Sequence, residues 1–125
     1  MTQSTDFGSI GQLSRSVADI AAAEAWWRDV LGVPHLYTYG PLAFFDCGGV
    51  RLMLSAEAGP AQANVIYFRV DDIDARFAEL TARGVEFQGK PHLIHRHPDG
   101  LEEWMAFFTD NEGRVLALMS QRRPA

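Results

Sequence analysis

The sequence has a single cysteine, Cys47, so the chain cannot form an internal disulfide. It has no apolar run near the roughly 18–20 residues that cross a bilayer, and residues 1–9 lack the basic start and apolar stretch of a signal peptide. Basic residues are also few, because 11 Lys and Arg against 16 Asp and Glu leave a formal charge of -5. We therefore expect a cytoplasmic domain that binds neither nucleic acid nor membrane.

What the sequence does contain is an internal repeat. Residues 17–20 (VADI) recur as 70–73 (VDDI), 31–33 (LGV) as 83–85 (RGV), and 44–54 as 107–118. Three matches in the same order are hard to obtain by chance, and a chain of this length fits one domain. We expect a single domain over residues 8–122, with repeat one at about 9–55, a linker at 56–63 and repeat two at about 64–121.

Each repeat has the same order of expected elements. A strand (12–17 or 65–70) shows alternating apolar residues, and a helix follows, with Asp19 or Asp72 at its N-cap and Gly32 or Gly84 at its C-terminal end. Three more strands complete each repeat: 36–39, 42–46 and 50–54 in the first, and 86–94, 103–108 and 114–120 in the second. A helix with a mostly antiparallel strand set predicts an α+β domain.

Alternation along these strands separates helix-facing from cavity-facing side chains, since successive side chains point to opposite faces. Leu13, Val17, Ile66, Phe68 and Val70 are expected to face the helices. The other face is expected to line a cavity and contact a ligand, through Gln12, Ser14, Met53, Val65, Tyr67, Arg69, Glu103, Phe107, Ala117 and Met119.

The segments VADI and WWRDVLG, YFRVDDI, and FFTDNEGRVLALMS resemble the vicinal oxygen chelate superfamily, which includes glyoxalase, bleomycin-resistance and dioxygenase proteins. The resemblance covers about residues 9–121. It implies two βαβββ units that form a curled mixed sheet around a cavity, a small-molecule ligand, and a homodimer. The last segment departs from the family's usual ending, because Asn111 and Glu112 stand where Pro and Asp are common.

The resemblance also implies where a metal ion would be held. The family's four ligand positions correspond to Gln12, Met53, Val65 and Ala117, and only Gln12 offers an oxygen atom that a hard divalent cation accepts. We therefore expect no metal and no other cofactor.

Other polar residues leave alternatives open. His92, His95 and His97 could be solvated hairpin residues, ligand contacts or metal ligands. Arg69 could bind an anionic group of a ligand or pair with a nearby carboxylate. Cys47 has no basic neighbour in the sequence and is not expected to be a nucleophile.

Three functional classes follow. The first is a small-molecule-binding protein without the usual metal site, which sequesters an aromatic or amphipathic compound as bleomycin-resistance proteins do. The second is a glyoxalase-like lyase or isomerase, or a dioxygenase-related enzyme, either metal-independent or with an unusual metal site. The third is an interaction module with a vestigial cavity. The sequence slightly favours the first, and it leaves open whether the chain is an enzyme.

Overall fold

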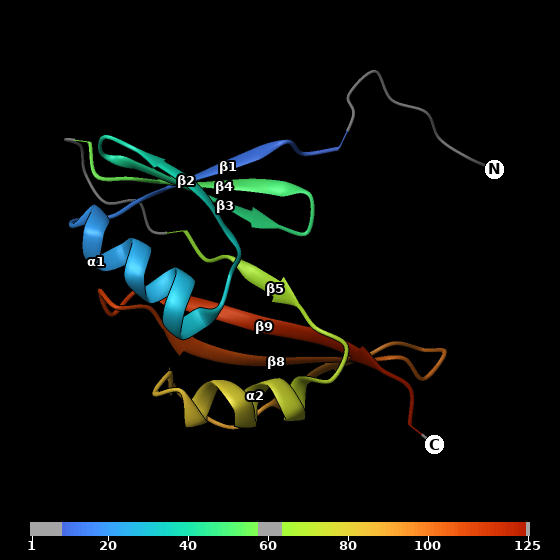
Figure 1. Ribbon diagram of the computed structural model, residues 1–125. Helices are drawn as coiled ribbons and strands as arrows, with labels where there is room; N and C mark the ends of the chain where they lie inside the picture. Colours follow the sequence, from blue (N-terminus) through green and yellow to red (C-terminus); the bar gives the residue numbers. More distant parts are fainter. Residues whose placement is uncertain (1–8, 58–63, 125) are drawn as a thin grey trace.

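The computed structural model describes residues 9–57 and 64–124 (Figure 1). Most of the expected linker, residues 58–63, lies outside the described residues, as do residues 1–8. Within the described ranges, no helix is long and apolar enough to cross a membrane.

The first unit forms a four-stranded mixed sheet. Its elements are β1 (Gln12–Ser16), α1 (Ile20–Ala25), a π-helical turn η1 (Trp26–Leu31), β2 (His35–Tyr39), β3 (Leu42–Cys47) and β4 (Val50–Ser55). The strand order is β1-β4-β3-β2, with β1 parallel to β4 and the other pairs antiparallel. We call this sheet 1.

The second unit repeats this order with a divided strand. Its elements are β5 (Tyr67–Arg69), α2 (Ile73–Ala82), β6 (Glu86–Phe87), β7 (His92–Arg96), β8 (Glu102–Thr109) and β9 (Val115–Arg122). The strand order is β5-β9-β8-β6, with β7 also paired to β8 and β5 parallel to β9. We call this sheet 2. The α+β class and the two βαβββ units are confirmed, and the two mixed sheets are not closed into a barrel.

The helix ends follow the expected chemistry. The Asp19 and Asp72 carboxylates accept hydrogen bonds from the backbone N–H groups of Ala22 and Ala75. Gly32 follows η1 with a φ of 82°, a left-handed conformation that favours glycine. The prediction of a single strand over residues 86–94 is wrong in detail. It divides into β6 and β7, because Pro91 between them has no N–H for the ladder.

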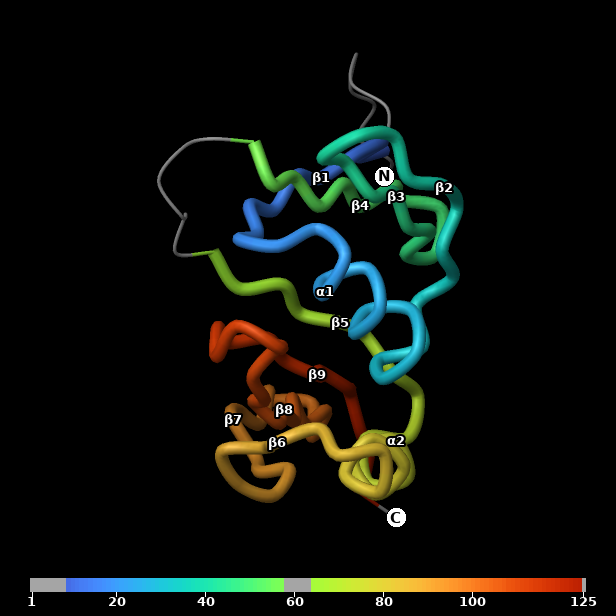
Figure 2. The backbone as a smooth tube through the Cα atoms, turned by 60° about the vertical axis from the view of Figure 1, so that its left-hand side comes forward, coloured from blue at the N-terminus to red at the C-terminus, as the bar shows by residue number. Residues whose placement is uncertain are grey.

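The two helices lie in different layers. In Figure 1, α1 lies beneath sheet 1 and above the second unit, whereas α2 covers the lower side of sheet 2. Figure 2, from another direction, shows α1 between sheet 1 and β5, and α2 beside β8. Each sheet therefore has one face covered by its helix and one uncovered face, and the uncovered face of sheet 1 points away from the second unit. The buried core joins both units and includes Trp27, Phe45, Leu52, Ile73, Phe108 and Leu116.

A buried ion pair connects the units. Arg15 points toward the helix-covered side of sheet 1 and is fully buried, and its Nη2 lies 3.1 Å from Asp110 Oδ2. Arg15 Nη1 also donates to the Asn64 side chain at 3.0 Å. Burial lowers the pKa of Arg15, and the Asp110 carboxylate opposes that shift. This contact explains why an arginine occupies a position where apolar residues are expected.

Candidate functional site

The uncovered side of sheet 2, opposite α2, carries an aromatic strip across three strands. Tyr67 on β5 and Phe107 on β8 are both paired with Ala117 on β9. Their rings meet edge to face, with centroids 6.1 Å apart. Ala117 is fully buried in the single chain, whereas Tyr67 is 46% exposed. Together with Arg69, Glu103 and Met119, these residues define the open face of sheet 2.

The same face ends in a polar group. The Glu103 carboxylate lies 2.7 Å from His97 Nε2 and accepts a hydrogen bond from the Gln121 amide at 2.9 Å. The hydrogen bond with His97, followed by the one from Gln121, lowers the pKa of Glu103, and the charge of Arg69 adds to the shift. Arg69 itself forms no ion pair within residues 9–57 and 64–124. An anionic ligand would therefore meet a free guanidinium here.

The uncovered side of sheet 1 is arranged differently. Gln12 Oε1 accepts a hydrogen bond from Arg51 Nε at 2.6 Å, and the Gln12 amide lies 3.9 Å from the Met53 sulfur. Arg51 also lies over the Phe44 ring, at 5.4 Å from its centroid. Ser14 is exposed on the same face. We call this the open face of sheet 1, and on it Gln12 and Arg51 already have each other as hydrogen-bond partners.

The ten residues expected to contact a ligand thus form two groups. Gln12, Ser14 and Met53 belong to sheet 1, and the other seven belong to sheet 2 or the segment just before it. Within one chain the two groups do not meet, because α1 and the covered side of sheet 1 lie between the open face of sheet 1 and the second unit. Their contact with a ligand stays a prediction.

The three histidines of the β7 region lie along the edge of the open face of sheet 2. His95 and His97 have ring centroids 4.7 Å apart, and the His92 ring lies 6.2 Å from that of Phe107. Among the residues that the structure describes, no group of three or more His, Cys, Asp or Glu side chains could hold a metal ion. The histidines therefore border the aromatic strip, and only His97 has a carboxylate partner.

The four positions that the family resemblance assigns to a metal do not fit a divalent ion. The Gln12 oxygen is already a hydrogen-bond acceptor for Arg51, and Met53 offers a thioether. Val65 and Ala117 have no donor atom, and Ala117 is buried. Hard cations need several oxygen or imidazole ligands, so this set cannot complete a coordination sphere.

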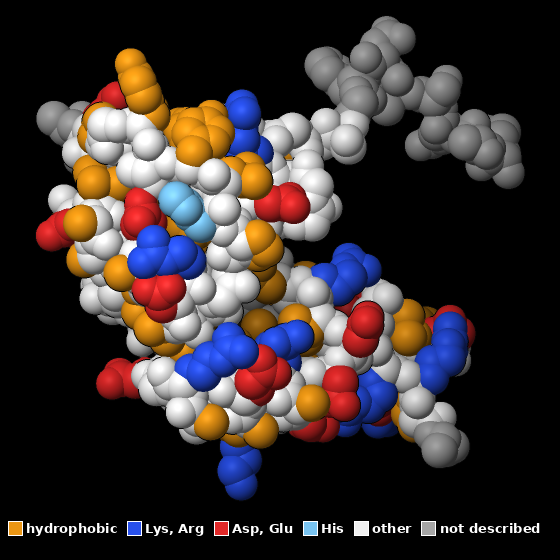
Figure 3. Space-filling view, in the orientation of Figure 1, with side chains coloured by type: hydrophobic (Ala, Val, Ile, Leu, Met, Phe, Trp, Pro, Cys, Tyr) orange, Lys and Arg blue, Asp and Glu red, His pale blue; other side chains and the backbone are white. Residues whose placement is uncertain are grey.

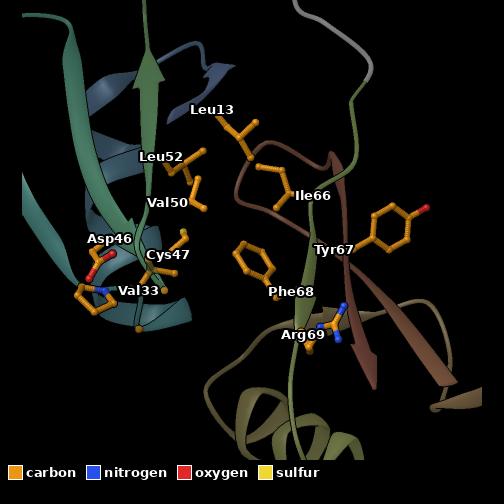
Figure 4. Close-up of a pocket in the computed structure, with 13 residues that line it drawn as sticks. Leu13, Val33, Asp46, Cys47, Val50, Leu52, Ile66, Tyr67, Phe68 and Arg69 are labelled. Atoms are coloured by element: carbon orange, nitrogen blue, oxygen red, sulfur yellow. The ribbon is translucent and has the colours of Figure 1, made fainter. Parts of the chain in front are cut away.

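A cleft of about 490 Å³ lies elsewhere, between the two units. Figure 3 shows the surface hollowed at this junction. In Figure 4, Leu13 and Leu52 from sheet 1 face Ile66 and Phe68 from the β5 segment. Sequence reasoning missed this cleft, because alternation assigns Leu13, Ile66 and Phe68 to a helix-covered face. The internal repeat offered a signal, because aligning the two units places Phe68 where the first unit has Arg15, so the two positions cannot make the same contact.

Comparisons with known proteins agree with this architecture. The family model of the Glyoxalase/Bleomycin resistance protein/Dioxygenase superfamily matches residues 9–116. A search of curated proteins gives no match. Among solved structures, lactoylglutathione lyase from Agrobacterium tumefaciens is 25% identical, with a TM-score of 0.73 and coverage of 93% of this chain and 96% of that one.

Two further structures share the fold. A superfamily member from Sphaerobacter thermophilus is 20% identical, with a TM-score of 0.73 and coverage of 91% of this chain and 98% of that one. A glyoxalase family protein from Bacillus anthracis is 18% identical, with a TM-score of 0.71 and coverage of 96% and 100%. At these identities the likeness concerns the fold alone.

Proposed function

The chain belongs to the glyoxalase/bleomycin resistance protein/dioxygenase superfamily, and we propose that it binds a small molecule on the open face of sheet 2 without the family's usual metal ion. The observation that carries this proposal is an uncovered sheet face with an aromatic strip beside Arg69, which forms no ion pair with the residues that the structure describes. Ligand sites commonly combine an apolar surface with a few polar anchors.

The lining indicates the class of ligand. Tyr67, Phe107 and Met119 offer flat and adaptable apolar contacts, which suit an aromatic body. Arg69 suits one acidic group, because a guanidinium binds carboxylates and sulfonates by charge-assisted hydrogen bonds. We therefore propose an aromatic or amphipathic acid, sequestered as bleomycin-resistance proteins do. The cytoplasm is the proposed location, since a lone cysteine suits a reducing compartment.

We also propose that a second copy of the chain completes the site. A sheet face that bears exposed aromatic side chains is a surface that proteins usually cover. Tyr37, which stacks on Phe44 over the open face of sheet 1, is 48% exposed, and Tyr67 on the open face of sheet 2 is 46% exposed. If the open face of sheet 1 in one copy covers the open face of sheet 2 in the other, Gln12, Ser14 and Met53 come to lie opposite Arg69.

The ligand proposal is tested with anilinonaphthalene sulfonate, a fluorescent aromatic acid. Arg69→Met should weaken its binding by roughly ten- to a hundredfold, because charge-assisted hydrogen bonds contribute about 1.5–3 kcal/mol. Arg76→Met is the matched control, since Arg76 lies on α2 and pairs with Glu79. Fluorescence titration measures both variants. Equal affinities in the two would contradict the assignment of Arg69.

The dimer proposal is tested by light scattering at micromolar concentration. The mass should be twice the 13.9 kDa of one chain, and Met53→Arg should shift it toward the monomer, because the new positive charge would lie opposite Arg69 in the proposed dimer and repel it. Leu93→Arg, on the edge strand β7, is the control. A monomeric wild type would exclude a site shared between copies.

A lyase or isomerase is the second candidate. One similar structure is a lactoylglutathione lyase, and the His97–Glu103 contact on the open face of sheet 2 is a possible acid–base pair. Lactoylglutathione lyase activity measured with and without added divalent metal distinguishes the candidates. Turnover that depends on one bound metal ion, and that is lost in Gln12→Ala, would replace the binding proposal with a metalloenzyme.

A further inference from the structure

We propose that the cleft between the two units is a second ligand site, on the opposite side of β5 from the aromatic strip of sheet 2, and that it takes a neutral, mainly apolar molecule. The site is formed by the helix-covered side of sheet 1 and by the β5 segment (Figure 4). It shares no wall with the open face of sheet 1.

The internal repeat explains why the cleft exists. The alignment that matches Val17 with Val70 matches Arg15 with Phe68, and the one that matches Gly49 with Gly113 matches Asp46 with Asp110. At one end of the junction between the units, Arg15 reaches across and pairs with Asp110. At the other end Phe68 replaces the arginine and cannot pair with Asp46, whose carboxylate instead accepts the N–H of Gly49 at 2.9 Å. The second end is therefore left open.

The dimensions of the open end suit a small molecule. Its volume of about 490 Å³ falls within the roughly 300–1,000 Å³ typical of ligand pockets. The walls are apolar on both sides, with Leu13, Val50 and Leu52 facing Ile66 and Phe68. Leu13 remains 43% exposed although it lines the cleft. A bound apolar molecule would remove this surface from water, which is favourable.

The cleft favours a neutral ligand, although Asp46, Tyr67 and Arg69 are among its lining residues. Figure 4 shows Ile66 and Phe68 directed toward sheet 1, whereas Tyr67 and Arg69 point to the other side of β5. Asp46 lies at the rim with its carboxylate bound to the hairpin backbone. An ion placed between the apolar walls would lose its hydration without gaining a partner. A neutral aromatic or aliphatic molecule meets no such penalty.

A cysteine in the cleft allows access to the cleft to be measured. Cys47, the only cysteine of the chain, is half-buried in the lining. Burial raises the pKa of its thiol, and the neighbouring Asp46 charge raises it further. Alkylation at about pH 9 therefore measures access to the cleft, because the thiolate is the reacting form.

The test uses phenylnaphthylamine, the neutral counterpart of anilinonaphthalene sulfonate. Fluorescence titration of the wild type should show binding. At about ten times its dissociation constant, phenylnaphthylamine should slow alkylation of Cys47 by iodoacetamide about tenfold, by mass action. Absence of binding, or binding that leaves the alkylation rate unchanged, would overturn the proposal. An alkylation rate that is slow without phenylnaphthylamine and rises when the protein is diluted would also overturn it, because a second copy of the chain would then occupy the cleft.

A pair of matched variants locates the probe. Leu13→Trp should weaken phenylnaphthylamine binding by about tenfold or more, because the larger side chain occupies the cleft. Leu36→Trp is the control, with the same substitution at a 50% exposed position on β2, outside the cleft. Equal effects of the two variants would contradict the site. Leu13→Trp should leave the binding of anilinonaphthalene sulfonate to the open face of sheet 2 unchanged, so failure of the open-face proposal and failure of the cleft proposal give different results.

Discussion

The two ends of the junction between the units start from equivalent sequence positions and differ in chemistry. One end is closed by the buried pair of Arg15 and Asp110, with Asn64 as a further partner. The other end brings Phe68 near the β3–β4 hairpin that carries Asp46 and leaves an apolar cleft. The two units therefore share a backbone arrangement, but the side chains at the two ends of the junction differ. One end is joined by a buried ion pair, and the other contains an apolar cleft.

The two open faces differ in the same way. On sheet 1 the arginine of the face, Arg51, is occupied by Gln12 and by the Phe44 ring. On sheet 2 Arg69 has no ion-pair partner within the described parts of the chain, and an aromatic strip lies beside it. To bind a ligand, Arg51 would have to give up its contacts with Gln12 and the Phe44 ring, so the second unit is the better candidate for anion recognition.

The largest expected effect comes from breaking the closed end. Arg15→Met should destabilise the fold by about 3–5 kcal/mol, because it leaves the Asp110 carboxylate buried without its cation. The Asp110 side chain is only 1% exposed in the folded chain. Urea unfolding measures the loss. Arg51→Met, at an exposed position, should cost less than about 1 kcal/mol. Similar losses in both would mean that the buried pair contributes no more than a surface arginine.

A smaller effect is expected at the open end. Phe68→Ala should cost about 1–3 kcal/mol, because Phe68 is only half-buried, although its ring contacts Trp27 at a centroid distance of 6.1 Å. The same urea experiment applies. If Phe68→Ala proved more costly than Arg15→Met, the open end would be the main attachment between the units, and the comparison would be reversed.

The smallest expected effect is a pH dependence of stability that comes from Glu102 in the second unit. Hydrogen bonds from Arg96 and then Trp104 lower the pKa of Glu102 in the folded chain. The stabilisation is therefore complete above the usual carboxyl pKa of about 4.3 and is lost as the pH falls through the lower folded value. Glu102→Gln should be less stable than the wild type near neutral pH and should approach it in acid. A difference in stability between Glu102→Gln and the wild type that does not change with pH would contradict the lowered pKa of Glu102.

The repeat, the order of helices and strands along the chain, and the helix caps could be read from the sequence because they depend on local patterns. Asp19 and Asp72 cap their helices as expected, and alternation separates Tyr67 and Arg69 from Ile66 and Phe68, as Figure 4 shows. The division of the strand around Pro91 could not be located as well, since element boundaries depend on how neighbouring strands pair.

The sequence by itself determined the family and the two-unit architecture, because both follow from residue identity and short-range spacing. Only the tertiary structure decided how the units meet. It paired Arg15 with Asp110, separated the two open faces, and left Leu13 and Phe68 lining a cleft. Alternation indicates which side of a strand a residue occupies, and the packing of α1 between the units determines whether that side is covered, paired or open.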